Sequence, residues 1–116
     1  MINVISSSRY RINKKNLRSK TEEILAKLDV AQELTLNLAF VGRNKMRSLS
    51  ETYKKENVAL PVLSFPYKGH VVDKAALLGE IVICYPQAVL LAAERNRRVE
   101  ETVLTLIKHG VENLLK

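Results

Sequence analysis

The sequence lacks several features that would place it outside the cytoplasm. It has one cysteine, Cys84, so an internal disulfide is excluded. No apolar run reaches the roughly 18 residues that a membrane-spanning helix needs. The amino-terminal residues, MINVISSSRYR, contain too short an apolar stretch and no small-residue cleavage site for a signal peptide. We therefore expect a cytoplasmic protein that does not enter a membrane.

Length and composition indicate one folded domain. The chain has 116 residues, of which 47% are hydrophobic and 27% are charged, the balance of a globular protein rather than a disordered one. This length suffices for one hydrophobic core and is short for two. We expect a single domain over residues 1–116.

Acidic residues are scarce relative to basic ones, and this favours a polyanionic partner. The sequence has 19 Lys and Arg against 12 Asp and Glu, a formal net charge of +7. A positive field of this kind attracts nucleic acid, although a solvated lysine surface gives the same composition. The basic residues gather in three places near expected element ends: Arg9 to Arg18, Lys54 and Lys55, and Arg95, Arg97 and Arg98.

Four segments are expected to be strands. Ile2–Ile5 is a short β-prone run, and Glu33–Val41 alternates apolar residues with less apolar ones, the period of a strand with one buried face. Leu60–Pro66 has a proline near each end, which suits an edge strand. Gly79–Tyr85 is rich in β-branched residues and apolar on both sides, so it is expected to be central.

Helical spacing predicts four helices between and after these strands. They cover Asn13–Leu28, Asn44–Lys54 with Asn44 as its cap, Gln87–Glu94 with Pro86 in its first turn, and Val99–Leu115. Gly110 is expected to interrupt the last helix and to allow close packing. Lys68–Lys74 is expected to be a turn. The fold class is α/β (α+β), with about four helices packed on a mixed sheet of about four strands.

Three motifs in order carry a resemblance to a known family. Tyr53–Pro66 ends in V-L-S-F-P, Gly79–Cys84 reads G-E-I-V-I-C, and Lys108–Leu115 reads K-H-G-V-E-N-L-L. This set resembles the YbeY family of rRNA-maturation endoribonucleases (UPF0054-type fold) over essentially the whole chain. The resemblance implies a zinc-dependent, single-strand-specific endoribonuclease that acts in 16S rRNA 3′-end maturation and ribosome quality control. The implied partners are rRNA and the small ribosomal subunit.

The resemblance also implies site residues. His109 matches the first metal-binding histidine, and Lys54 occupies the position of the family's arginine, so both are candidate catalytic residues. The strand that carries Ser64 borders the substrate cleft in the family. With the basic residues near expected element ends, it completes the set of candidate RNA-binding residues: Lys54, Lys55, Ser64, Arg95, Arg97 and Arg98. In such a site three protein ligands hold zinc and leave one position open for an activated water.

The sequence departs from the family at this site. Asn113 stands where the second histidine is expected, and the third ligand's position lies beyond Lys116. Lys54 keeps the arginine's charge but cannot form the paired hydrogen bonds by which arginine binds phosphate. Pro61 replaces an acidic residue. The family implies zinc, but asparagine is a poor zinc ligand and only one of the three metal-binding histidines is present in this sequence. The only other histidine is His70.

Several of these residues also have a purely structural interpretation. His109 can be a histidine stabilised near the carboxyl end of a helix, Ser64 can be strand core, and Cys84 is most simply a buried apolar residue. The role of Glu80 is open. Two functions follow: a metal-dependent ribonuclease whose site is completed by other residues or a second chain, or a catalytically inactive RNA- or ribosome-binding relative without metal. A native chain that continues past Lys116 is a third possibility.

Overall fold

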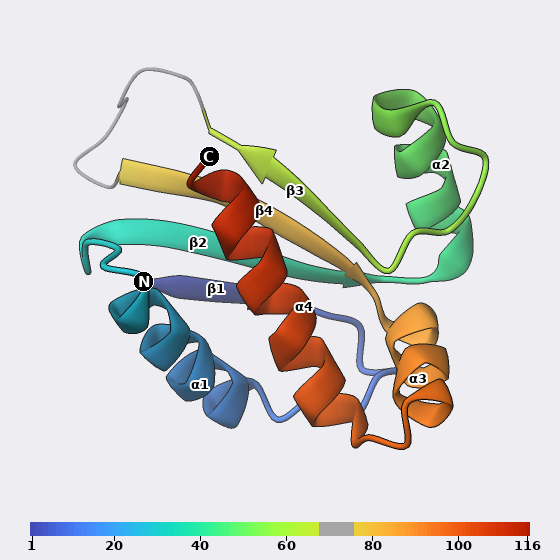
Figure 1. Cartoon of the computed structure of the whole chain (residues 1–116), viewed down its shortest axis with the longest axis horizontal. Coiled ribbons are helices and arrows are strands. Elements are labelled where there is room, and N and C mark those ends of the chain that lie inside the picture. The colour runs from blue at the N-terminus through green and yellow to red at the C-terminus, as the bar shows by residue number, and fades with distance from the viewer. Residues whose placement is uncertain (68–75) are drawn as a thin grey trace.

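The computed structural model describes residues 1–67 and 76–116, which form four strands and four helices (Figure 1). The order along the chain is β1 (Ile2–Ile5), α1 (Lys14–Lys27), β2 (Leu34–Val41), α2 (Arg43–Lys54), β3 (Val62–Pro66), β4 (Ala76–Cys84), α3 (Tyr85–Glu94) and α4 (Val99–Leu114). This is the α/β arrangement predicted from the sequence. The turn predicted at 68–74, with His70, lies outside the described residues.

The strands form one mixed sheet in the order β1-β2-β4-β3. β1, β2 and β4 are parallel, and β3 pairs antiparallel with β4 at the edge. The edge position of β3 and the interior position of β4 confirm both predictions. Pro61 precedes β3 and Pro66 ends it, where a missing N–H is tolerated because the outer side of an edge strand has no partner strand.

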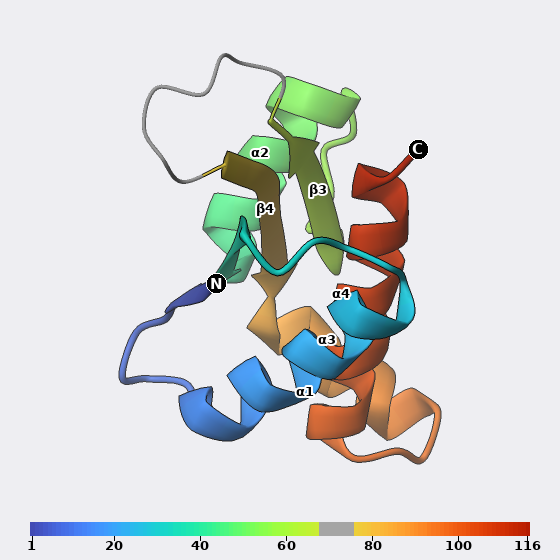
Figure 2. The ribbon, with the colours of Figure 1, turned by 90° about the vertical axis from the view of Figure 1, so that its left-hand side faces the viewer.

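The two faces of the sheet are covered by different helices, as Figure 2 shows. On one face, the side chains of Leu36, Leu38, Ile81 and Ile83 are buried in a core that includes residues of α1 and α4. On the other face, Met46 of α2 joins a smaller cluster with Leu63, Val82 and Cys84. α2 and α4 therefore lie on opposite sides of the sheet.

The amino ends of the first two helices differ in how they are capped. Asn13 caps α1, since its side-chain oxygen accepts a hydrogen bond from the Asn16 N–H at 3.0 Å. The predicted cap at Asn44 is wrong: α2 begins at Arg43, and Gly42 is its N-cap without a side-chain hydrogen bond. β2 ends at Val41, so the chain enters the helix sooner than the polar residue at 44 suggested.

Gly110 does not interrupt α4, which runs unbroken from Val99 to Leu114, so that expectation is wrong. The expectation of close packing is confirmed. A Cβ at position 110 would lie 3.0 Å from Ile81 Cδ1 and 3.1 Å from Ser64 Oγ. Both distances are tighter than ordinary contacts, so the missing side chain lets α4 approach the sheet at β3 and β4.

The boundary between β4 and α3 lies one residue earlier than predicted. β4 ends at Cys84, and Tyr85 already belongs to α3, with Pro86 in its first turn as predicted. Within residues 1–67 and 76–116, no helix combines the length and apolarity needed to cross a membrane.

Candidate functional site

His109 lies exposed in the last third of α4, next to the buried Gly110. The Gly110 carbonyl accepts a hydrogen bond from the Ser64 hydroxyl at 3.1 Å. This bond ties edge strand β3 to the turn of α4 that carries His109. The structure thus brings two of the predicted site residues to neighbouring positions, with Ser64 acting on the backbone of the helix.

The described residues do not supply a zinc site on their own. Asn113, also exposed, lies one helical turn after His109 and offers a carboxamide, which zinc rarely takes as a ligand. Residues 1–67 and 76–116 contain no cluster of three His, Cys, Asp or Glu side chains placed to hold a metal ion. Zinc at His109 would need donors from outside the described residues.

Cys84 lies on the far side of the sheet from His109. Its side chain is buried with Met46, Leu63 and Val82, on the α2 face. Burial raises the pKa of its thiol, against smaller lowering effects from a hydrogen bond with the Gln87 backbone and the charge of Arg43. A neutral, buried thiol fits the interpretation of Cys84 as a packed apolar residue.

Lys54 and Lys55 are exposed at the carboxyl end of α2. Lys55 ends the helix in the left-handed conformation, with φ 57°. Because α2 and α4 cover opposite faces, Lys54 and His109 belong to helices on opposite sides of the sheet (Figure 2). β3 is the edge strand of that sheet. The structure does not join them into one cluster.

The three arginines lie at the other end of α4. Arg95, Arg97 and Arg98 are exposed in the connection between α3 and α4, and Arg97 pairs with Glu101 at 3.8 Å. Arg98 precedes His109 by eleven residues, which is about 16 Å along a helix that rises about 1.5 Å per residue. These arginines are thus remote from His109 along α4, and they belong to a different connection from Lys54 and Lys55 at the end of α2.

A groove that the sequence did not reveal lies between α2 and the sheet. It has a volume of about 430 Å³ and is lined by Ala39, Val41, Lys45, Leu49, Tyr53, Phe65, Glu80 and Val82. Lys45, Leu49 and Tyr53 recur at intervals of four, so they form one stripe of α2. The spacing of these three residues was visible in the sequence, but it predicted only a helix and no ligand site. Placing Glu80 opposite it required the strand register.

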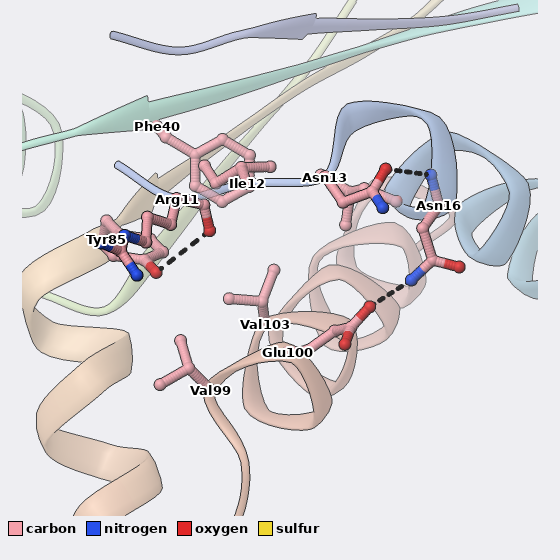
Figure 3. Close-up of a pocket in the computed structure, with 10 residues that line it drawn as sticks. Arg11, Ile12, Asn13, Asn16, Phe40, Tyr85, Val99, Glu100 and Val103 are labelled. Atoms are coloured by element: carbon pink, nitrogen blue, oxygen red, sulfur yellow. Dashed lines mark hydrogen bonds between the residues drawn. The ribbon is translucent and has the colours of Figure 1, made fainter. Parts of the chain in front are cut away.

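A second cavity, of about 310 Å³, lies between α1, α4 and the start of α3 (Figure 3). The Asn16 side-chain amide donates to the Glu100 carboxylate, and the Tyr85 hydroxyl donates to the Arg11 carbonyl at 3.5 Å. Its polar groups thus bond to one another across the cavity. None of the residues predicted to bind RNA or metal lines it.

The fold defines the class of this protein as a small α/β domain with a four-stranded mixed sheet. Its structure is similar to the solution structure of TM1509 from Thermotoga maritima, with a TM-score of 0.66 at 24% identity. The match covers 100% of this chain and 73% of that one.

The sequence comparisons define the family. The model for Endoribonuclease YbeY matches residues 3–115, so the chain belongs to the YbeY endoribonuclease family. It is 31% identical over 104 residues to Endoribonuclease YbeY of Sulfurihydrogenibium sp. (strain YO3AOP1), covering 90% of this chain and 68% of that protein. The corresponding enzyme of Aquifex aeolicus is 29% identical over 112 residues, covering 97% and 73%.

The chain is shorter than its relatives. It spans 52% of Endoribonuclease YbeY of Finegoldia magna, to which it is 31% identical over 80 residues and 69% of its own length. The family assignment predicted from the three motifs is confirmed.

Proposed function

We propose that this protein acts in rRNA maturation by binding single-stranded RNA of the small ribosomal subunit and cleaving it near His109. The match over residues 3–115 to the YbeY endoribonuclease model carries the proposal. The net charge of +7 and two exposed basic regions support it, because phosphate contacts dominate RNA affinity.

In this proposal each predicted residue has a role that its position allows. Lys54 and Lys55 offset phosphate charge at the carboxyl end of α2, and Arg95, Arg97 and Arg98 hold the strand at the far end of α4. Ser64 positions the turn that carries His109 through its bond to the Gly110 carbonyl. His109 is the residue nearest to the reacting phosphate, and zinc remains the cofactor that the family implies.

A second candidate function is RNA or ribosome binding without cleavage. One specific observation favours it: the position one helical turn after His109 is Asn113, whose carboxamide is a poor zinc ligand. Such a protein keeps the fold and the basic surface, and binds RNA in a salt-dependent way without metal.

Both candidates can be tested on one purified protein. Single-stranded RNA with the sequence of the 16S rRNA 3′ end is incubated with it, with and without a chelator, and zinc per chain is measured by elemental analysis. The nuclease predicts cleavage that stops with chelator and in His109→Ala, while Lys116→Ala, a matched exposed control, stays active.

Each other outcome has a defined meaning. RNA that is retained but never cut, together with a chain free of zinc, would select the binding factor. Failure to retain single-stranded RNA even at low salt would contradict both candidates. Cleavage that survives chelator and the His109→Ala change would remove His109 from the reaction.

A further inference from the structure

A row of side chains crosses all four strands on the face that α2 covers. The strand register pairs Asn3 with Asn37, Asn37 with Glu80, and Glu80 with Phe65. These residues alternate with Leu36, Leu38 and Ile81, which are buried on the opposite face. The Asn3 amide donates to the Asn37 side-chain oxygen at 3.0 Å. The row therefore runs across the sheet into the groove, where its last two members are the Glu80 carboxylate and the Phe65 ring.

Glu80 is the unusual member of this row. It is half-buried in the floor of the groove defined above, beside Val82 and Phe65. No side chain among the described residues donates a hydrogen bond or an ion pair to its carboxylate. Burying part of a carboxylate without a hydrogen-bond donor costs free energy. A ligand that donates hydrogen bonds to this carboxylate would therefore bind favourably.

Aromatic rings flank that carboxylate. Tyr53 from α2 and Phe65 from β3 contact each other edge to face, with ring centroids 5.0 Å apart. Tyr53 nevertheless remains 60% exposed, so much of its ring is free to contact another group. Exposed rings next to hydrogen-bonding side chains are the usual surface on which proteins hold unstacked RNA bases.

The groove continues into a basic recess. Lys45 lines both the groove and a neighbouring recess of about 380 Å³ that Arg9 and Arg43 also line. This recess lies where β2 and β4 end and their following helices leave to opposite faces, the switch point at which α/β sheets commonly bind ligands. The three cations provide charge for a phosphate at one end of the groove.

We propose that this groove binds a guanine nucleotide within single-stranded RNA. The base lies against Tyr53 and Phe65, its N1–H and N2–H₂ donate to the Glu80 carboxylate, and its phosphate lies near Lys45 and Arg43. Guanine alone presents two adjacent donors on its Watson–Crick edge. Adenine and cytosine place a ring acceptor beside their single amino donor, and uracil flanks its N–H with carbonyls. This inference rests on the proposed function, since it names the base that the RNA-binding protein selects.

Binding of fluorescent RNA pentamers, followed by anisotropy at fixed low salt, tests the inference. The pentamers are adenosines with guanosine, inosine or adenosine at the centre, and inosine lacks only the N2 amine. Wild type should prefer guanosine to inosine and adenosine, by about 5- to 100-fold for a paired contact. Glu80→Gln, nearly isosteric, should abolish that preference, so that the three pentamers bind with the same affinity as one another. Glu22→Gln, an exposed carboxylate of α1, is the matched control and should keep it.

A second pair of variants tests the phosphate end. Lys45→Ala should weaken all three pentamers alike and lower the salt slope by about one. Lys27→Ala, an exposed lysine at the end of α1, should change neither. Circular dichroism melts of each variant establish that it is folded before its binding is interpreted.

The other results overturn the inference in distinguishable ways. Equal affinity for the three pentamers, or a guanosine preference that survives Glu80→Gln, would remove the base site and leave the proposed function standing. Free GMP that binds as tightly as the guanosine pentamer would replace RNA by a mononucleotide. Self-association blocked by Tyr53→Ala, without base preference, would assign the face to a second copy of the chain. No binding to any RNA would overturn the proposed function itself.

Discussion

The two faces of the sheet differ in how completely their side chains are buried. Toward α1 and α4 the sheet side chains are fully buried: Leu36, Leu38, Ile81 and Ile83 are 0% exposed and belong to one core cluster with Ile107 and Val111 of α4. The face toward α2 is half open, with the Asn3–Asn37 amide pair, a carboxylate that has no side-chain partner among the described residues, and the exposed Tyr53. The first face holds the fold together, and the second leaves chemistry available to a ligand.

The largest expected effect breaks the closed face. Ile107→Ala removes a side chain that is 0% exposed and should cost about 2–5 kcal/mol of unfolding free energy, because it leaves a cavity between α4 and the sheet. Leu49→Ala, the half-buried counterpart on α2, should cost clearly less. Urea unfolding followed by circular dichroism measures both, and equal losses would mean that the two faces do not differ in this way.

A smaller effect tests the contact between α4 and the sheet. Alanine normally stabilises a helix relative to glycine, by up to about 1 kcal/mol. Gly110→Ala should instead destabilise the protein, by about 1–3 kcal/mol, because its Cβ would press on Ile81 and Ser64. Lys108→Ala, exposed on the same helix, should be nearly neutral in thermal melts. A stabilising Gly110→Ala would contradict the close approach.

Replacing an asparagine by alanine near the start of α1 and of α2 tests which of the two asparagines caps its helix. Asn13→Ala should cost about 1 kcal/mol, because the amide oxygen that accepts the Asn16 N–H is lost. Asn44→Ala should cost less than half of that, since Asn44 lies inside α2 and caps nothing. Chemical denaturation of the two variants provides the comparison, and a larger loss at Asn44 would restore the cap predicted from the sequence.

The smallest effect concerns Cys84 and pH. Burial raises the pKa of its thiol above the ordinary 9.0, so the unfolded chain loses this proton at lower pH than the folded one. Its contribution to stability is therefore present below pH 9 and is lost as pH rises toward the folded pKa. Stability measured from pH 8 to pH 10.5 should fall more steeply in wild type than in Cys84→Ala. Parallel curves would show that Cys84 does not contribute to this loss.

The elements were predictable because their signals are local. The alternation in 33–41, the β-branched residues of 79–85 and the helical spacing of 99–115 each depend only on neighbours in the chain, and all three elements formed where expected. The boundaries at Asn44 and Tyr85 were missed because both depend on where the preceding strand ends. The uninterrupted α4 at Gly110 was missed because packing on Ile81 outweighs the intrinsic cost of glycine.

The site was only partly predictable for a related reason. The sequence motifs indicated His109, Ser64 and Lys54 as one group, yet they arise from three elements, and only the tertiary structure determines which face each element covers. It brings Ser64 to the His109 turn and puts Lys54 across the sheet. Glu80 had no identifiable role in the sequence, since its meaning depends on the register that aligns it with Asn37 and Phe65.

The central claim is that this protein binds single-stranded RNA through its basic surface. The most direct test is the affinity for a single-stranded oligonucleotide and for a duplex of the same sequence, measured across a series of salt concentrations. The account predicts tighter binding to the single strand, with the logarithm of affinity falling linearly with the logarithm of salt. Equal or stronger binding to the duplex, or no binding at the lowest salt, would contradict it.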